Sequence, residues 1–159
     1  MAARRGVAGR GARGTGKHEA AASLDAVARA VKDPQRLVPG LEALGPLEVL
    51  LGPLGKTARD ALEARAGREA LAAWDARRWK TARAVVAAGL PAFGREGDIG
   101  AALVELGAAL RYELRACRAG DREPPREQYI ACLDLALVVF PPASDERAWA
   151  EKRLAELSK

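Results

Sequence analysis

The sequence has few of the residues that carry metal, disulfide or triad chemistry, since it contains one histidine and two cysteines in 159 residues. Two thiols with no accompanying histidine cannot complete a tetrahedral zinc site, and they cannot form a disulfide scaffold. The single histidine, His18, lies near the N-terminus, so no serine or cysteine has a histidine base close by. We therefore expect no metal, no cofactor and no catalytic residue.

Aromatic residues and long hydrophobic runs are also scarce. Aromatics make up 4% of the chain, and 36 of its nominally hydrophobic residues are alanine, which leaves 20 leucines and 10 valines to form the core. No run of about 18 apolar residues occurs, so no membrane span is expected. Cys117 and Cys132 fall on apolar helix faces, and reduced thiols of this kind indicate an intracellular, cytoplasmic protein.

The net charge of +5 is confined to the start of the chain. Residues 1–18 contain five glycines, no carboxylate and five of the 26 basic residues: Arg4, Arg5, Arg10, Arg13 and Lys17. The remaining 21 basic residues balance the 21 acidic ones. With so little apolar content we expect residues 1–18 to be a disordered arm.

An Arg/Gly arm suits the phosphates of nucleic acid or another acidic partner, because guanidinium groups pair with phosphate in bidentate fashion. Two alternatives remain open. The arm is an inert basic tail, or it is an organelle-targeting segment, for which its glycines and few apolar residues are unfavourable. Arginine also outnumbers lysine along the whole chain, which a GC-rich coding sequence would explain equally well.

Residues 11–17 match the P-loop pattern in Gly11, Gly16 and Lys17. However, His18 stands where a P-loop has a serine or threonine for magnesium, and no hydrophobic strand precedes the segment. A nucleotide-binding enzyme is therefore the third and least favoured interpretation.

The body has helical periodicity throughout and is predicted to be a single all-α domain over residues 19–159. Residues 19–32 form an amphipathic helix that Asp33-Pro34 ends. Residues 34–55 form a bend of short helical turns, in which the two Gly-Pro pairs of a repeated L-G-P-L end one turn and begin the next. A long helical segment follows over about 56–89, in which Gly67 is a candidate interruption, with Gly89 and Pro91 as its stop signals.

Three further helices are predicted over residues 98–157. The first has Asp98 as its N-cap, an apolar stripe from Ile99 to Cys117, and Gly120 as its end. The second spans about 125–140 between two Pro-Pro pairs, and Ser144 caps the last. The expected fold is a compact bundle or short array of five to six antiparallel helices with a disordered arm.

These last three helices resemble tetratricopeptide hairpins. The likeness rests on Leu106-Gly107, on Ala136-Leu137 with Pro141, and on Trp149. It implies helical hairpins with protein-binding grooves between them. The first helix is longer than in that family, and no second copy occurs at the family's period.

One body segment has a basic bias. Residues 56–83 carry eight basic and four acidic side chains, centred on Trp74, Arg77, Arg78, Trp79, Lys80 and Arg83. Tryptophans interleaved with arginines at helical spacing can stack on bases and pair with phosphates. Alternatively, both tryptophans face the core and the arginine stems cover them.

Two functions remain after these exclusions. The first is a non-enzymatic helical module of a nucleoprotein or viral or phage-like assembly, whose arm contacts nucleic acid or an acidic partner while the helical domain contacts a protein or another copy. The second is a protein-binding helical adaptor with an inert tail. Nothing in the sequence reads base edges, so no sequence preference is predicted.

Overall fold

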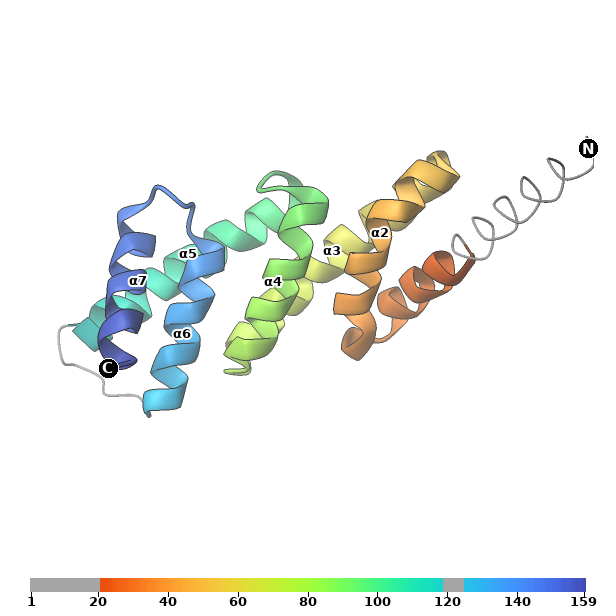
Figure 1. Ribbon diagram of the computed structural model, residues 1–159. Coiled ribbons are helices and arrows are strands. Elements are labelled where there is room, and N and C mark those ends of the chain that lie inside the picture. Colours follow the sequence, from red (N-terminus) through yellow and green to blue (C-terminus); the bar gives the residue numbers. More distant parts are fainter. Residues whose placement is uncertain (1–20, 119–124) are drawn as a thin grey trace, which may run out of the picture. The chain divides into compact units, whose positions relative to one another are not determined.

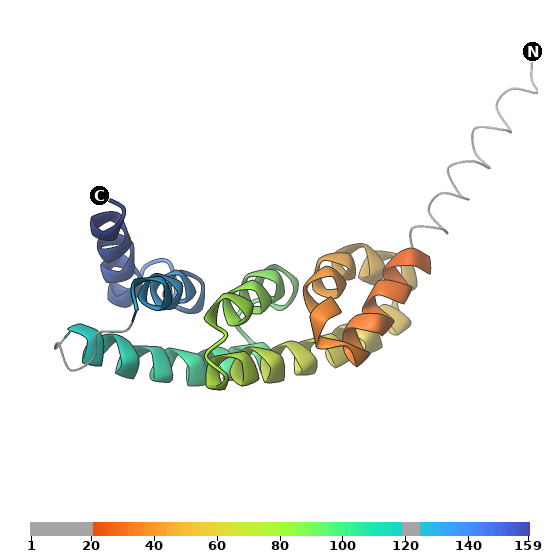
Figure 2. The ribbon, with the colours of Figure 1, turned by 90° about the horizontal axis from the view of Figure 1, so that it is seen from below.

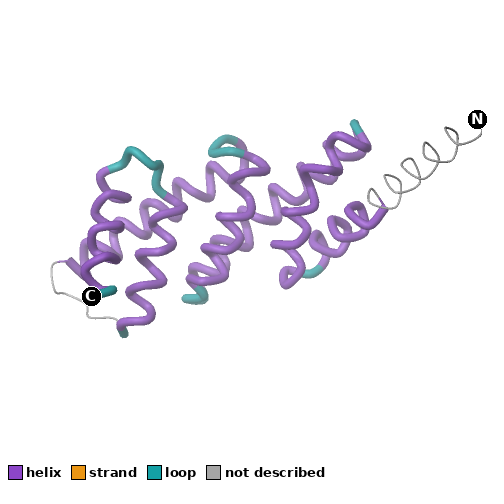
Figure 3. Tube along the Cα trace, viewed as in Figure 1, coloured by secondary structure: helices purple, strands orange, loops and turns teal. Residues whose placement is uncertain are grey.

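A computed structural model describes residues 21–118 and 125–159, without the side chains of 45–51, 53, 54 and 98. In these residues the chain is helical with short connections and no strand (Figure 3). A helix described from residue 21 to residue 32 comes first, and a 3₁₀ helix, η1 (Pro34–Arg36), follows it. The others are α2 (Leu37–Leu51), α3 (Pro53–Asp75), α4 (Trp79–Phe93), α5 (Gly97–Arg118), α6 (Arg126–Val139) and α7 (Asp145–Leu157) (Figure 1).

The all-α prediction is therefore confirmed, but the described residues form seven α-helices rather than five or six. None of the described helices combines the length and the apolarity that a membrane crossing requires. The described residues divide into two compact units, one up to residue 62 and one from residue 63 to residue 159. The prediction of one domain over residues 19–159 stays a prediction.

In the first unit the helix ending at residue 32 packs closely on α2. Asp33 terminates the helix as predicted, and its side chain then accepts a hydrogen bond of 3.0 Å from the Gln35 amide in η1. Val27, Leu37, Leu41 and Leu44 form the core, whereas Leu24 is 42% exposed.

The prediction of short turns over residues 34–55 is wrong, because α2 is a continuous helix of 15 residues. Pro39 is the third residue of α2, where a backbone N–H has no helical acceptor in any case. Pro46 removes one hydrogen bond, yet the helix continues through it. The burial of Leu41 and Leu44 on one face outweighs this local cost. Only the second Gly-Pro pair separates two helices, with Gly52 at a φ of 53° and Pro53 first in α3.

The long helical segment predicted over 56–89 consists of two helices, because the chain breaks between α3 and α4, and Gly67 lies inside α3 rather than at the break. Arg77 adopts a left-handed φ of 57° and donates its amide hydrogen to the Trp74 carbonyl at 2.9 Å. The Arg78 amide bonds the Ala73 carbonyl at 2.8 Å. Together these bonds form a Schellman motif, in which Arg77 takes the position that usually holds glycine.

Gly89 and Pro91 do not end α4, which continues to Phe93. Gly89 is buried, and a Cβ there would overlap the side chain of Ile99, so its role is close packing against α5. The helix ends at Gly94, whose φ of 71° suits its position after the last turn. Asp98 is not the residue before α5, since α5 begins at Gly97.

The second unit is built around α6, which packs against α4, α5 and α7. Figure 2 shows α4, α6 and α7 on one side of α5. The predicted stripe of α5 is confirmed, because Ile99, Leu103, Leu106, Leu110 and Leu114 are all buried. The α6 boundaries and the α7 cap are also confirmed, with the Ser144 hydroxyl accepting a hydrogen bond of 3.3 Å from the Arg147 amide.

Candidate nucleic-acid interface and a second groove

The predicted arm lies outside the described residues. This applies to Arg4, Arg5, Arg10, Arg13 and Lys17, to the P-loop-like segment 11–17, and to Gly120. Their predicted roles stay predictions. The body residues of the predicted interface can be located.

Four of the predicted residues lie together at the turn between α3 and α4. Arg77, Arg78, Trp79 and Lys80 line a cavity of about 290 Å³, and we call these four residues the Trp79 patch. The three cations are exposed, and Trp79 is half-buried. Glu127 and Gln128, from the first turn of α6, complete most of the lining. The cavity thus has three cations and one carboxylate.

Two helix N-termini point toward this cavity. Helices α4 and α6 run side by side in the same direction, so both begin at the same end of the unit (Figure 1). Within the described residues neither start has a side-chain cap, because Arg78 and Pro125 precede the helices and make no capping hydrogen bond. Uncapped first-turn amides and the positive ends of two helix dipoles add to the charge of the three cations.

The remaining two residues of the predicted basic segment lie beside the cavity rather than in it. Trp74 is half-buried, and its ring centroid is 6.2 Å from that of Trp79 at an interplanar angle of 47°. Arg83 is exposed one turn further along α4. Both tryptophans are therefore intermediate between the predicted core and surface positions. Trp74 and Arg78 do not share a helix face, since α3 ends at Asp75.

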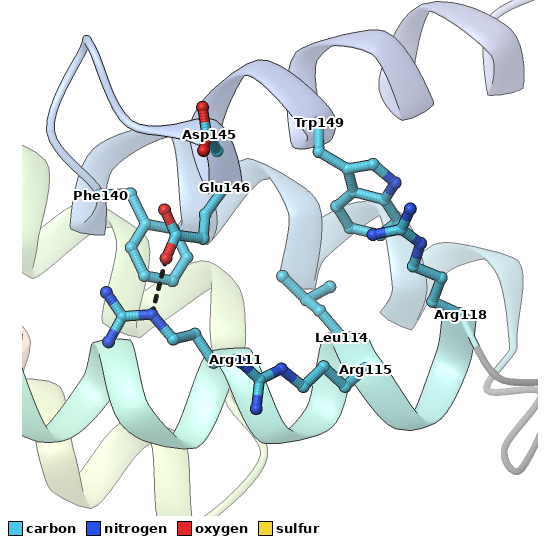
Figure 4. A pocket seen from close by; sticks show the side chains of 8 residues that line it. All are labelled: Arg111, Leu114, Arg115, Arg118, Phe140, Asp145, Glu146 and Trp149. Carbon is cyan, nitrogen blue, oxygen red and sulfur yellow. Dashed lines mark hydrogen bonds and ion pairs between the residues drawn. The ribbon is translucent and has the colours of Figure 1, made fainter.

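A second groove, which the sequence analysis missed, lies between α5 and α7. It encloses about 270 Å³, and we call it the α5 groove. Its walls are three arginines at helical spacing on α5 together with apolar side chains (Figure 4): Arg111, Arg115, Arg118, Leu114, Phe140 and Trp149. The spacing of four and three residues was a signal of one basic face. The facing Trp149 could not be found from spacing, because it comes from a helix that is distant in the sequence.

The charges of the α5 groove are partly paired. The Arg111 Nε atom donates a hydrogen bond of 2.8 Å to Glu146 Oε1, and the Arg111 guanidinium lies 5.2 Å from the Phe140 ring centroid. This hydrogen bond is the main reason why the pKa of Glu146 is lowered from its ordinary value of 4.5. Arg118 lies 5.7 Å from the ring centroid of Trp149, while Arg115 is exposed. Asp145 is the second carboxylate of the lining.

The groove continues along α5 beyond Arg111. A neighbouring cavity of about 250 Å³ shares Arg111 and Phe140 with it and is also lined by Gly100 and Val104. Arg95 forms the far end, where its guanidinium donates to the last carbonyls of α6, at 2.7 Å to that of Val139. The two cavities together run along one face of α5.

The cysteines differ in their surroundings. Cys132 is buried, as predicted, and burial raises the pKa of its thiol to about 12, with smaller contributions from Glu113 and Cys117. Cys117 is half-buried. Among the described residues no three His, Cys, Asp or Glu side chains come together as a metal-binding group.

Comparison of the chain with protein-family models, with curated proteins and with solved structures finds no match.

Proposed function

We propose that the chain is a non-enzymatic binding module of a nucleoprotein assembly, and that it contacts the phosphate backbone of nucleic acid. The observation that carries this proposal is the cavity of the Trp79 patch, where Arg77, Arg78 and Lys80 meet two uncapped helix N-termini. The arm, with five more positive charges, is the proposed second contact.

The patch has the chemistry of a phosphate site. Arginine pairs with phosphate in bidentate geometry, lysine adds a point charge, and first-turn amides donate to the same oxygens. A single carboxylate, Glu127, opposes these groups. The excess of positive charge therefore favours an anion at this place.

The conformation of Arg77 supports the same proposal. A left-handed backbone costs a non-glycine residue about 1–2 kcal/mol, and glycine would avoid that cost. The long cationic side chain of Arg77 is exposed, and two hydrogen bonds fix the backbone from which it projects. Strained positions of this kind are concentrated at functional sites.

Trp79 supplies an aromatic surface beside the cations. Base stacking on an aromatic side chain contributes about 1–3 kcal/mol per base and tolerates any sequence. Single-stranded nucleic acid, whose bases are free to stack, therefore suits the patch better than a duplex. Replacing Trp79 with leucine should weaken the binding of a labelled oligo(dT) strand.

The test is a salt titration of oligo(dT) binding with the full chain. Neutralising Arg78 and Lys80 together, as Arg78→Gln/Lys80→Gln, should reduce the slope of log K against log salt by about 1.4, because each lost phosphate contact removes about 0.7. The matched control is Arg115→Gln/Arg118→Gln, which removes the same charge from the α5 groove. An equal loss in both variants would mean that only net charge matters and that the patch is not the interface.

The alternative function is a protein-binding helical adaptor with an inert tail. The α5 groove favours it, because this groove has apolar walls and a half-buried tryptophan. An adaptor of this kind predicts no salt-dependent binding of oligo(dT) by any variant, including the chain without residues 1–18. The oligo(dT) titration therefore distinguishes the two functions, because only the nucleic-acid module is expected to bind the strand.

A further inference from the structure

We infer that the α5 groove binds an acidic peptide segment of a partner protein, one that carries an apolar anchor residue. This inference rests on the groove and not on the nucleic-acid proposal, so each can fail without the other.

The charge of the groove selects a negatively charged occupant. Arg111, Arg115 and Arg118 project from one face of α5, and Glu146 is already engaged by Arg111 (Figure 4). Arg115 is exposed and its charge contributes to the lowered pKa of Glu146, and Arg118 lies over the ring of Trp149. These two guanidinium groups can each pair with a carboxylate in bidentate geometry.

The walls of the groove select a peptide rather than a polyphosphate. Leu114 and Phe140 are buried beneath the arginines, and Trp149 forms the opposite wall on α7. A cavity of about 270 Å³ with such walls accepts a leucine or aromatic side chain. Asp145 and Glu146, at one rim, would repel a chain that carries a charge at every unit, whereas a peptide can place its carboxylates only opposite Arg115 and Arg118.

The length of the groove also fits a peptide. The face of α5 from Gly100 to Arg118 extends over about 27 Å at 1.5 Å per residue. Val104, which is 75% exposed, lies along this path. The neighbouring cavity, which shares Arg111 and Phe140 with the α5 groove, lies along it as well. An extended segment of about eight residues would cover this distance. The chain's own arm is not a suitable occupant, because it has five positive charges and no carboxylate.

The experiment is a selection from a random peptide display library on the full chain, with depletion on Arg115→Glu/Arg118→Glu. Circular dichroism establishes that both proteins have the same helical content. We expect the retained peptides to be enriched in aspartate and glutamate around a leucine or aromatic residue. A synthetic peptide of the consensus should then bind Arg115→Gln/Arg118→Gln about tenfold more weakly, in line with two partly exposed ion pairs.

Two further variants distinguish peptide binding at the α5 groove from oligo(dT) binding at the Trp79 patch. Trp149→Leu should weaken the consensus peptide while leaving oligo(dT) binding unchanged. Arg78→Gln/Lys80→Gln should leave peptide binding unchanged. The inference is overturned if no peptide is retained, if the retained peptides have no acidic excess, or if they bind the charge-reversed variant equally well. The inference is also overturned if no peptide is enriched and the wild type self-associates while the charge-reversed variant does not. That result would assign the groove to a second copy of the chain.

Discussion

Two glycines of α5 provide a matched test of the packing along the α5 groove. Gly100 and Gly107 lie in the same helix, and both line the cavity next to Arg111. On helix propensity alone, either one replaced by alanine should stabilise the protein by about 0.5–1 kcal/mol. The surroundings of the two positions differ, however, and we expect their replacements to have opposite signs.

At Gly107 an added Cβ would lie 3.5 Å from Phe140 Cε1 and 3.9 Å from Val139 Cγ1, which is ordinary van der Waals contact. Gly107→Ala should therefore stabilise the second unit by about 0.5–1 kcal/mol. At Gly100 the added Cβ would overlap the carbonyl oxygen of Arg95 and lie 2.9 Å from its carbonyl carbon. Backbone atoms cannot move aside as a side-chain end can, so overpacking costs about 1–3 kcal/mol. After the propensity gain, Gly100→Ala should destabilise by about 1–2 kcal/mol.

The assay is urea unfolding followed by tryptophan fluorescence. All three tryptophans, at 74, 79 and 149, belong to the unit of residues 63–159, so the signal reports that unit. With a urea slope of about 2 kcal/mol per molar, the midpoint should rise by about 0.3–0.5 M for Gly107→Ala and fall by about 0.5–1 M for Gly100→Ala. Midpoints that move in the same direction would refute the packing described here for the start of α5.

Three other perturbations have expected results. Arg77→Gly should raise the free energy of unfolding by about 1 kcal/mol in the same urea assay, because glycine adopts the left-handed φ without cost; a loss of stability would contradict the Schellman geometry. Burial raises the pKa of Cys132 to about 12, so the unfolded chain loses this proton above pH 9 while the folded one keeps it. The difference in free energy of unfolding between the wild type and Cys132→Ala should therefore be constant below pH 9. Above pH 9 the wild type should lose about 1.4 kcal/mol per pH unit relative to the variant. A difference in urea midpoint that does not change with pH would refute this. In Arg111→Gln the lowered pKa of Glu146 should return toward 4.5, which NMR titration of the carboxyl carbon measures. The stability that the Arg111–Glu146 pair contributes to the wild type should be present above pH 4.5 and lost as the pH falls below it.

The sequence was a good guide where local signals and burial agree. The Ser144 cap and the acidic first turn fix the start of α7, and proline pairs bound α6. The apolar stripe of α5 repeats from Ile99 to Leu114, so its burial could be predicted without knowing what covers it.

The sequence was a poor guide where proline and glycine had to be interpreted locally. Pro46 and Gly89 look like helix breaks, but both lie inside helices, and Leu44 near Pro46 and Val86 near Gly89 are buried. The break at Arg77 has no proline or glycine, and the chain accepts a left-handed arginine there. At Pro46 and Gly89 tertiary packing outweighs a local preference of about 1–3 kcal/mol, whereas the break at Arg77 is fixed by its two local hydrogen bonds.

The candidate site, too, could be predicted from the sequence only in part. Arg77, Arg78, Trp79 and Lys80 are consecutive, so their clustering could be predicted from the sequence. Their meeting with Glu127 and with the start of α6 depends on the parallel packing of α4 and α6, which spacing does not indicate.

The most direct test of the proposed function is the salt dependence of oligo(dT) binding, measured by fluorescence anisotropy. Four full-length or truncated proteins are compared: the wild type, the chain without residues 1–18, Arg78→Gln/Lys80→Gln, and Arg115→Gln/Arg118→Gln. We predict that the truncation and the patch variant each lower the slope of log K against log salt, while the groove variant has the wild-type slope. A wild type that does not bind oligo(dT) at low salt, or a patch variant with an unchanged slope, would contradict the proposal.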